Sequence, residues 1–168
     1  MRTLAVFALA FGVLFGLGCG ARMSGSSDEF SPLVNGLRGR LVVSGSAPFT
    51  VELELENLGT TPLHVSVADP TSVSAKVTDA SGANLPTVGS YPAANAAAQI
   101  IEIPPAGRHR HTISEVQPGG NLSLGGQIWN LSRGQRYQLI ATWASRVEGG
   151  ETPWTGTLQL PSATVSSF

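Results

Sequence analysis

Apolar and polar residues alternate with a period of two along most of the chain after residue 36, and this pattern predicts β-strands. The clearest run is Phe49–Glu56, in which the apolar residues share one face and the glutamates share the other. Similar alternation predicts strands at 37–44, 63–67 and 73–77. Turn-forming residues separate the runs about every 8–12 residues, which indicates an antiparallel β-sandwich.

The middle of the chain gives a less regular pattern. Residues 83–98 are rich in Ala, Pro and Asn, and the sequence leaves them open as a loop, a helical turn near Ala96 or an edge strand. Ile100–Ile103 is predicted as a short strand that ends at a Pro-Pro-Ala-Gly turn. We expect residues 108–114 to be the hairpin partner of this strand.

Two further segments complete the pattern. Residues 115–126 are expected to form a Gly-rich link. The last segment, 154–168, predicts a pair of strands or one bent strand that Pro161 interrupts. No repeat with a period of about 20–50 residues is present, so a solenoid is excluded.

The stretch from Trp129 to Trp143 carries the most specific pattern for a fold. Leu131, Gly134 and Tyr137 have the spacing L-x-x-G-x-x-Y, and a strand of alternating apolar residues begins at the tyrosine. This stretch resembles the tyrosine corner of immunoglobulin-like and fibronectin-III-like sandwiches. The resemblance implies an all-β, antiparallel immunoglobulin-like β-sandwich of about seven to nine strands.

The first residues are typical of an export signal, with Arg2 before the apolar run 4–17 and small residues around Cys19. This segment, residues 1–19, resembles the signal and lipobox of bacterial lipoproteins. The resemblance implies that the thiol of Cys19 is diacylated and anchors the mature protein to a membrane. The alternative is ordinary cleavage near Gly18 or Ala21, which would release a secreted or periplasmic soluble protein.

Small polar residues dominate the next segment, 20–35, which is predicted to be a flexible tether. The sandwich domain is then expected to occupy residues 36–168. This organisation places the protein in the cell envelope as an exported lipoprotein.

Composition and charge exclude several classes of function. Charged residues make up 12% of the chain and the formal net charge is -1, so no basic face for nucleic acid is expected. Cys19 is the single cysteine, which leaves the domain without a disulfide or thiol chemistry. No nucleophile elbow, P-loop or dinucleotide-binding motif is present, and the sequence predicts no cofactor and no enzymatic activity.

The glutamates Glu52, Glu54 and Glu56 suggest calcium, but a straight strand cannot bring three same-face carboxylates onto one ion. We expect a solvated face instead, with Arg38 and Arg40 of the preceding strand as cross-strand partners.

The paired histidines His109 and His111 share one strand face, with Arg108 and Arg110 on the other. Zinc would need further ligands, and His64 is the only other histidine. We therefore predict no metal site and a half-exposed strand face.

The aromatic residues allow two interpretations. Trp129, Trp143 and Trp154 are expected to pack in the core and at its ends, which is usual in such folds. Alternatively, Tyr91 and Trp154, both beside prolines, form an exposed platform for a sugar or peptide ligand.

The sequence as a whole predicts a non-enzymatic, lipid-anchored envelope protein whose domain has a binding or structural function. Its partner would be an unknown envelope protein or a glycan. Two alternatives remain open: a carbohydrate-binding module that uses the platform, and a regulator of proteases. The second rests on the stretch Gly134-Gln-Arg-Tyr137, which resembles a bacterial proteinase-inhibitor family built on a similar small sandwich.

Overall fold

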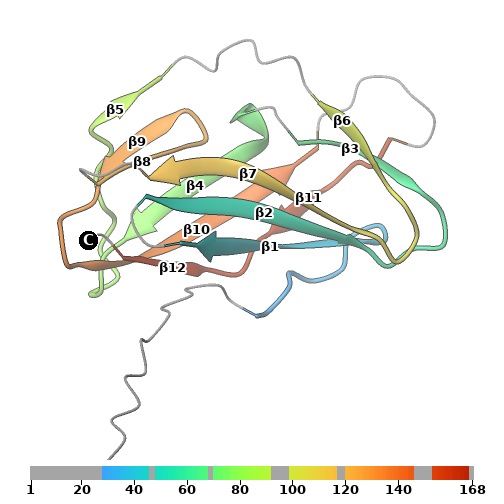
Figure 1. Ribbon diagram of the computed structural model, residues 1–168, viewed down its shortest axis with the longest axis horizontal. Helices are drawn as coiled ribbons and strands as arrows, with labels where there is room; N and C mark the ends of the chain where they lie inside the picture. Colours follow the sequence, from blue (N-terminus) through green and yellow to red (C-terminus); the bar gives the residue numbers. More distant parts are fainter. Residues whose placement is uncertain are drawn as a thin grey trace, which may run out of the picture.

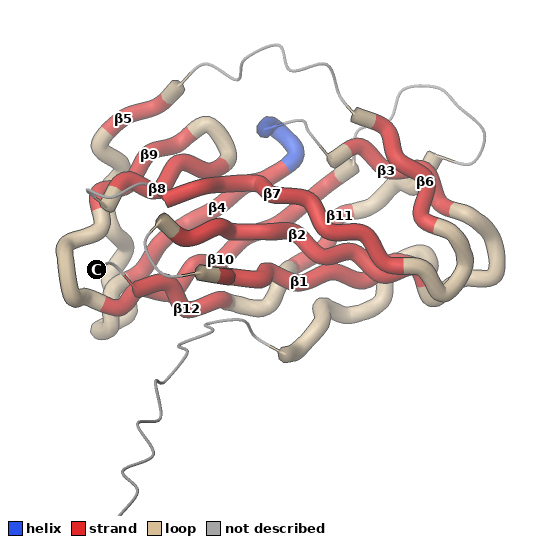
Figure 2. The backbone as a smooth tube through the Cα atoms, viewed as in Figure 1, coloured by secondary structure: helices blue, strands red, loops and turns tan. Residues whose placement is uncertain are grey.

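Antiparallel β-sheets make up the fold, and the predicted all-β class is confirmed in the computed structural model (Figure 1). Figure 2 shows strands along most of the backbone, with the short 3-10 helix η1 (Pro70–Ser72) before β4. The structure describes residues 28–45, 48–67, 70–91, 99–116, 120–145 and 153–166. The predicted signal segment, Cys19 and the possible helical turn near Ala96 lie outside these residues.

One layer of the fold is a sheet in the order β1-β2-β7, formed by β1 (Leu37–Ser44), β2 (Phe49–Asn57) and β7 (Arg108–Val116). The first two strands agree with the sequence pattern. The predicted hairpin between Ile100–Ile103 and residues 108–114 is wrong, because β7 pairs with β2 instead. This register sets the arginines of β7 opposite the glutamates of β2, and opposite charges on facing residues favour the pairing.

The second layer is centred on β10 (Arg136–Ala144). On one edge it pairs with β4 (Val73–Thr78). On the other edge it pairs first with β12 (Ala163–Ser166) and then with β11 (Thr157–Gln159). These two strands lie end to end on either side of Pro161, so the last segment behaves as one interrupted strand, in agreement with the sequence pattern.

Two smaller sheets extend the layers. The strands β3 (Leu63–Ser66) and β6 (Ile100–Ile103) pair with each other. A three-stranded sheet has the order β5-β9-β8, and its strands are β5 (Gly89–Ser90), β8 (Asn121–Leu124) and β9 (Gln127–Asn130).

The expected link 115–126 therefore contains a strand, β8, which the sequence pattern missed. Gly125 and Gly126 both have positive φ angles, 59° and 78°, and form the tight turn between β8 and β9. Such a turn matches the twist of two antiparallel strands and closes a two-residue hairpin. The described residues hold twelve strands, more than the seven to nine expected, because strands as short as β5 and β8 carry too few residues to give a clear periodic signal.

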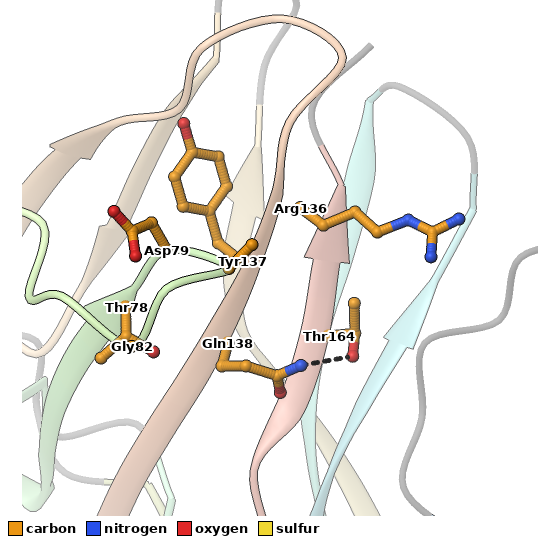
Figure 3. Close-up of a pocket in the computed structure, with 8 residues that line it drawn as sticks. Thr78, Asp79, Gly82, Arg136, Tyr137, Gln138 and Thr164 are labelled. Atoms are coloured by element: carbon orange, nitrogen blue, oxygen red, sulfur yellow. Dashed lines mark hydrogen bonds between the residues drawn. The ribbon is translucent and has the colours of Figure 1, made fainter.

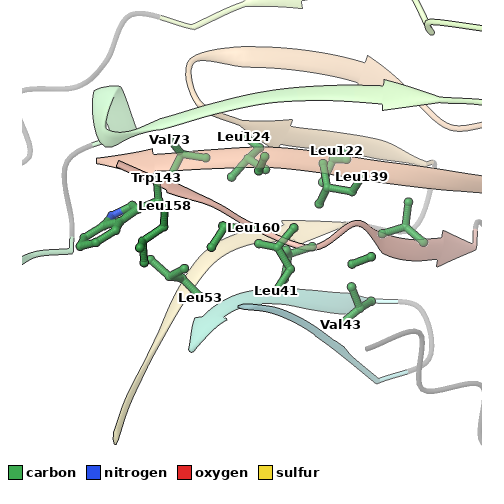
Figure 4. Close-up of a cluster of buried hydrophobic side chains, with 14 of the residues drawn as sticks. Leu41, Val43, Leu53, Val73, Leu122, Leu124, Leu139, Trp143, Leu158 and Leu160 are labelled. Carbon is green, nitrogen blue, oxygen red and sulfur yellow. The ribbon is translucent and has the colours of Figure 1, made fainter. Parts of the chain in front are cut away.

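The core lies between the two main layers (Figure 4). Leu41 and Leu53 reach it from the β1-β2-β7 sheet, and Leu139 and Trp143 reach it from β10. Each is at most 1% exposed. Burial of a side chain of this kind stabilises the fold by about 1.5–3 kcal/mol.

All three tryptophans are buried, which confirms the packing interpretation. The rings of Trp143 and Trp154 stack with their centroids 5.4 Å apart. Trp154 is 2% exposed, so its proposed role as an exposed ligand platform is wrong. Its indole Nε1–H donates to the carbonyl oxygen of Val34 over 3.2 Å, and this partner allows the polar end of the ring to be buried.

Candidate functional site

The turn before β10 is closed by the tyrosine that the L-x-x-G-x-x-Y spacing singled out. The Tyr137 hydroxyl oxygen accepts a hydrogen bond from the backbone N–H of Ser132 over 3.0 Å. Gly134 has a φ of 75° in this turn, and Leu131 is buried beneath it. This corner fixes where β10 enters its sheet.

A ladder of charges, which we call the arginine–glutamate ladder, crosses the outer face of the β1-β2-β7 sheet. On its β1 side, Arg38 Nε donates to Glu56 Oε2 and Arg40 Nε donates to Glu54 Oε2, each over 2.6 Å. The predicted cross-strand pairing is thus confirmed. The predicted solvated face is wrong, however, because Glu54 and Glu56 are only 3% and 6% exposed.

The β7 side of the ladder supplies a second pair of arginines. Arg108 Nε donates to Glu56 Oε1 over 2.8 Å, and Arg110 Nη2 donates to Glu54 Oε2 over 3.4 Å. Each buried carboxylate therefore lies between two guanidinium groups. Paired charges of this kind compensate for the water that burial removes.

The charge pairing decides the ionisation of the two glutamates. Burial by itself raises the pKa of the Glu54 carboxyl, but hydrogen bonds and charges from Arg40 and Arg110 outweigh it and lower the pKa below its usual value. The pKa of Glu56 is lowered in the same way: Arg108 and Arg38 outweigh the effect of burial. Both carboxylates are thus held in the ionised form.

Phe30, in the segment before β1, places its ring against three arginines of the ladder. The guanidinium carbons of Arg38, Arg40 and Arg108 lie 4.4, 4.7 and 5.7 Å from the ring centroid. Such cation–π contacts favour the position of the guanidinium groups over the ring.

The next residue fixes this N-terminal segment to β1. The backbone N–H of Ser31 donates to the carbonyl oxygen of Gly39 over 2.8 Å, and the N–H of Gly39 donates to Ser31 Oγ over 3.0 Å. The predicted tether, 20–35, therefore includes residues that contact the domain. Sequence reasoning missed Phe30 because one aromatic residue in a polar segment gives no periodic signal.

The two histidines of β7 lie opposite Leu55 and Leu53 of β2, and both are half-buried. Burial lowers the pKa of His109, as does the charge of His111, and burial also lowers the pKa of His111. No group of three potential metal ligands occurs among the residues that the structure describes.

A shallow cleft of about 380 Å³ lies where β10 begins (Figure 3). Its lining includes Asp79, Arg136, Gln138 and Thr164, and Gln138 Nε2 donates to Thr164 Oγ1 over 3.1 Å. Asp79 Oδ1 accepts hydrogen bonds from the Ser81 side chain and from backbone N–H groups, and these lower its pKa. The cleft can hydrogen-bond a small polar ligand.

Four loops meet at the opposite end of β10, and we call them the loop end. The described residues that make up the loop end are 32–36, 58–62, 104–107 and 153–156. Asn57 is fully buried among them: its Nδ2 donates to the carbonyl oxygens of Thr61 and Ile103, both over 2.9 Å. Its Oδ1 accepts from the N–H of Gly59 over 2.8 Å.

Further hydrogen bonds join the remaining loops. The N–H of Leu58 donates to the carbonyl oxygen of Gly36 over 2.8 Å, and Asn35 Nδ2 donates to the carbonyl oxygen of Thr155 over the same distance. The loop end is therefore preorganised by contacts between loops. The sequence signal for Asn57 was its position after a strand and two residues before a glycine, which is typical of an Asx turn.

Tyr91, the second residue of the suggested platform, is half-buried beside the β8–β9 hairpin. Its backbone N–H donates to the carbonyl oxygen of Gly126 over 3.1 Å. The structure does not bring it together with Trp154 into one exposed aromatic surface, because Trp154 is covered.

Comparisons with other proteins found no similarity: no protein-family model matches the chain, and no curated protein or solved structure matches it. Within the described residues, no helix has the length and apolar character needed to cross a membrane.

Proposed function

We propose that the protein is an exported, lipid-anchored bacterial envelope protein whose immunoglobulin-like domain binds another envelope component without catalysing a reaction. The anchor is Cys19, which follows an apolar run of signal-peptide length. The alternative for its location is a secreted or periplasmic soluble form, released by cleavage near Gly18 or Ala21.

The immunoglobulin-like part of the proposal is supported by strand order. In constant-type immunoglobulin domains, strands A, B and E share one sheet, and strand F lies between C and G in the other. Here β1, β2 and β7 share one sheet, and β10 lies between β4 and the β11–β12 edge. The hydrogen bond of Tyr137 to the N–H of Ser132 stands at the start of the strand that would be F.

The observation that carries the binding function is the preorganised loop end. Hydrogen bonds between loops, centred on the buried Asn57, hold exposed side chains in place before any partner arrives. Preorganisation lowers the entropy that binding must remove, so a rigid set of loops is suited to recognition. Loops held by a sandwich are common binding surfaces.

A protease regulator is the second candidate, and one observation favours it. Leu58 is 46% exposed on a loop that Asn57 fixes, as an inhibitory loop would present a side chain to an enzyme pocket. An inhibition panel against envelope proteases tests it: a nanomolar inhibition constant that Leu58→Asp abolishes supports this candidate. For a carbohydrate-binding module, binding to a glycan array that Tyr91→Ala abolishes is the corresponding result.

Two experiments test the main proposal. Membrane fractionation of cells producing Cys19→Ala should move the protein from the membrane to the soluble fraction, and unchanged membrane association would contradict the lipid anchor. Chemical cross-linking in intact native cells, followed by mass spectrometry, should give one dominant envelope partner. Cross-linked species no different from those of an unrelated lipoprotein would contradict the binding function.

A further inference from the structure

We infer that ordered water occupies a buried polar site at the C-terminal end of β10, where it bridges the indole N–H of Trp143 to the hydroxyl groups of Ser66 and Ser72. We define the buried polar site as Ser66, Ser72, Trp143 and Ser145. This inference is independent of the proposed binding function, because it concerns how the small β3–β6 sheet is joined to the second layer.

The site holds most of the buried polar atoms that have no partner. Among the described residues, four buried side-chain polar atoms lack a hydrogen-bond partner within the protein: Ser66 Oγ, Ser72 Oγ, Ser114 Oγ and Trp143 Nε1. Three of these atoms belong to the site, and their residues are at most 3% exposed. A buried hydroxyl or N–H group without a partner is destabilising and rare in folded proteins, so three of them in one region point to an occupant.

The strand register brings these side chains together. Trp143 lies opposite Val73 of β4, and Ser72 immediately precedes Val73 at the end of η1. Ser145 follows two residues after Trp143, and its Oγ accepts a hydrogen bond from the backbone N–H of Ser66 over 3.0 Å. The buried polar site is therefore built where the ends of β3, η1 and β10 meet. Figure 4 shows the Trp143 ring at one end of the cluster of core side chains.

The chemistry of the site selects water as the occupant. An indole N–H can only donate, whereas a hydroxyl group can donate and accept, so a water molecule can accept from Trp143 and donate to the two serines. None of the four side chains carries a charge, and an ion would gain no compensation for its lost hydration. A buried water typically makes about three hydrogen bonds, which the unpartnered atoms of the site can supply.

Bridging water completes the attachment of β3 to the second layer. Two direct hydrogen bonds from β3 lie in this region: the N–H of Ser66 donates to Ser145 Oγ, and the N–H of Trp154 donates to the carbonyl oxygen of His64 over 2.9 Å. Water-mediated hydrogen bonds are nearly as favourable as direct ones in enthalpy. The β3–β6 sheet is thus held to β10 partly by protein groups and partly by water.

Transfer of NMR magnetisation from water to the indole N–H groups tests the inference. The full chain, labelled with ¹⁵N at its tryptophans and held in detergent micelles, is measured in plain buffer. We expect a cross-peak between water and the Trp143 N–H with opposite signs in laboratory-frame and rotating-frame spectra, which marks a bound water rather than proton exchange. The Trp154 N–H, which donates to Val34, is the internal control and should show none. No such cross-peak at Trp143, or an equal one at Trp154, would overturn the inference.

Two serine variants distinguish a site that holds water from a dry one. If water bridges the groups, Ser66→Ala and Ser72→Ala each remove one of its partners and should lower the melting temperature by about 3 °C. In a dry site, the same changes delete an unpartnered polar atom and should raise the melting temperature. Ser114→Ala is the matched control, because Ser114 Oγ is also buried and unpartnered but lies on β7, opposite Val51. An unchanged or raised melting temperature in both site variants, or an equal loss in Ser114→Ala, would overturn the inference.

Discussion

Arg40 Nε and Glu54 Oε2 are 2.6 Å apart, and the Glu54 carboxylate is almost inaccessible to water. Removing the arginine would leave a buried charge with only the longer contact to Arg110. We predict that Arg40→Ala lowers the free energy of unfolding by about 3 kcal/mol, measured by urea denaturation. Arg110→Ala is the control: its half-exposed side chain should matter less, about 1 kcal/mol or below. Equal losses of unfolding free energy in the two variants would contradict the inference that Arg40 contributes more to stability than Arg110.

Acid should destabilise the protein in two stages. The pKa values of His109 and His111 are lowered in the folded state, so the unfolded state binds more protons once the pH falls below about 6.5. The pKa values of Glu54 and Glu56 are lowered as well, so their stabilisation is complete above about pH 4.3 and is lost below it. Urea melts between pH 8 and pH 3 should show both declines.

The histidine stage has its own control. The double variant His109→Gln, His111→Gln should remove the decline that begins near pH 6.5 and keep the decline at lower pH. If the upper decline persists in this variant, other groups must be responsible for it.

The Tyr137 hydroxyl closes the turn before β10, so Tyr137→Phe should lower the free energy of unfolding by about 1 kcal/mol. Tyr137→Ala removes a buried ring in addition and should lower it by about 3–5 kcal/mol. Chemical denaturation measures both changes. An unchanged free energy of unfolding in Tyr137→Phe would show that the hydrogen bond to Ser132 adds nothing to stability.

Trp154 stacks on Trp143 in the core, and we expect Trp154→Ala to lower the free energy of unfolding by about 3–5 kcal/mol. Trp154→Phe should recover part of this loss, because it restores a stacking ring but leaves unfilled space and lacks the hydrogen bond to Val34. Thermal melts of the two variants make the comparison, and a fully stable alanine variant would contradict the burial.

Two glycines with positive φ should respond differently to alanine. Around Gly134 the space is open, so Gly134→Ala meets only backbone strain and should lower the free energy of unfolding by about 1–2 kcal/mol. At Gly125, the added methyl group would also clash with the carbonyl oxygen of Val73. Gly125→Ala should therefore be the more destabilising of the two in urea melts, and the reverse order would contradict the close approach of this hairpin to β4.

The sequence was sufficient to predict features that depend on local alternation. Strand β2 and its buried face were predictable, because each apolar residue of Phe49–Glu56 must face the core if its neighbours are polar. The partner of β7 was not, because pairing with β2 joins residues more than fifty positions apart, whereas the incorrect hairpin required only the nearest strand.

The candidate site residues also divide into those that a local sequence pattern predicts and those that depend on distant contacts. The corner at Tyr137 has a fixed local spacing, which a sequence displays directly. The buried Glu54 is paired with arginines from two other strands, and no local pattern specifies that arrangement. The loop end depends on hydrogen bonds from Asn57 to Thr61 and Ile103, of which only the local one follows a recognisable turn signal.

The attachment of Phe30 to the ladder also sets how far an anchored domain can travel. If the segment were free up to Leu37, eighteen residues beyond Cys19 could extend to about 60 Å. With Phe30 held in place, the reach ends at the eleventh residue after Cys19, and this span is about 40 Å at most. If Cys19 carries the proposed anchor, the domain would sample a thin layer above the bilayer, where a partner in the same membrane would be encountered at a high effective concentration.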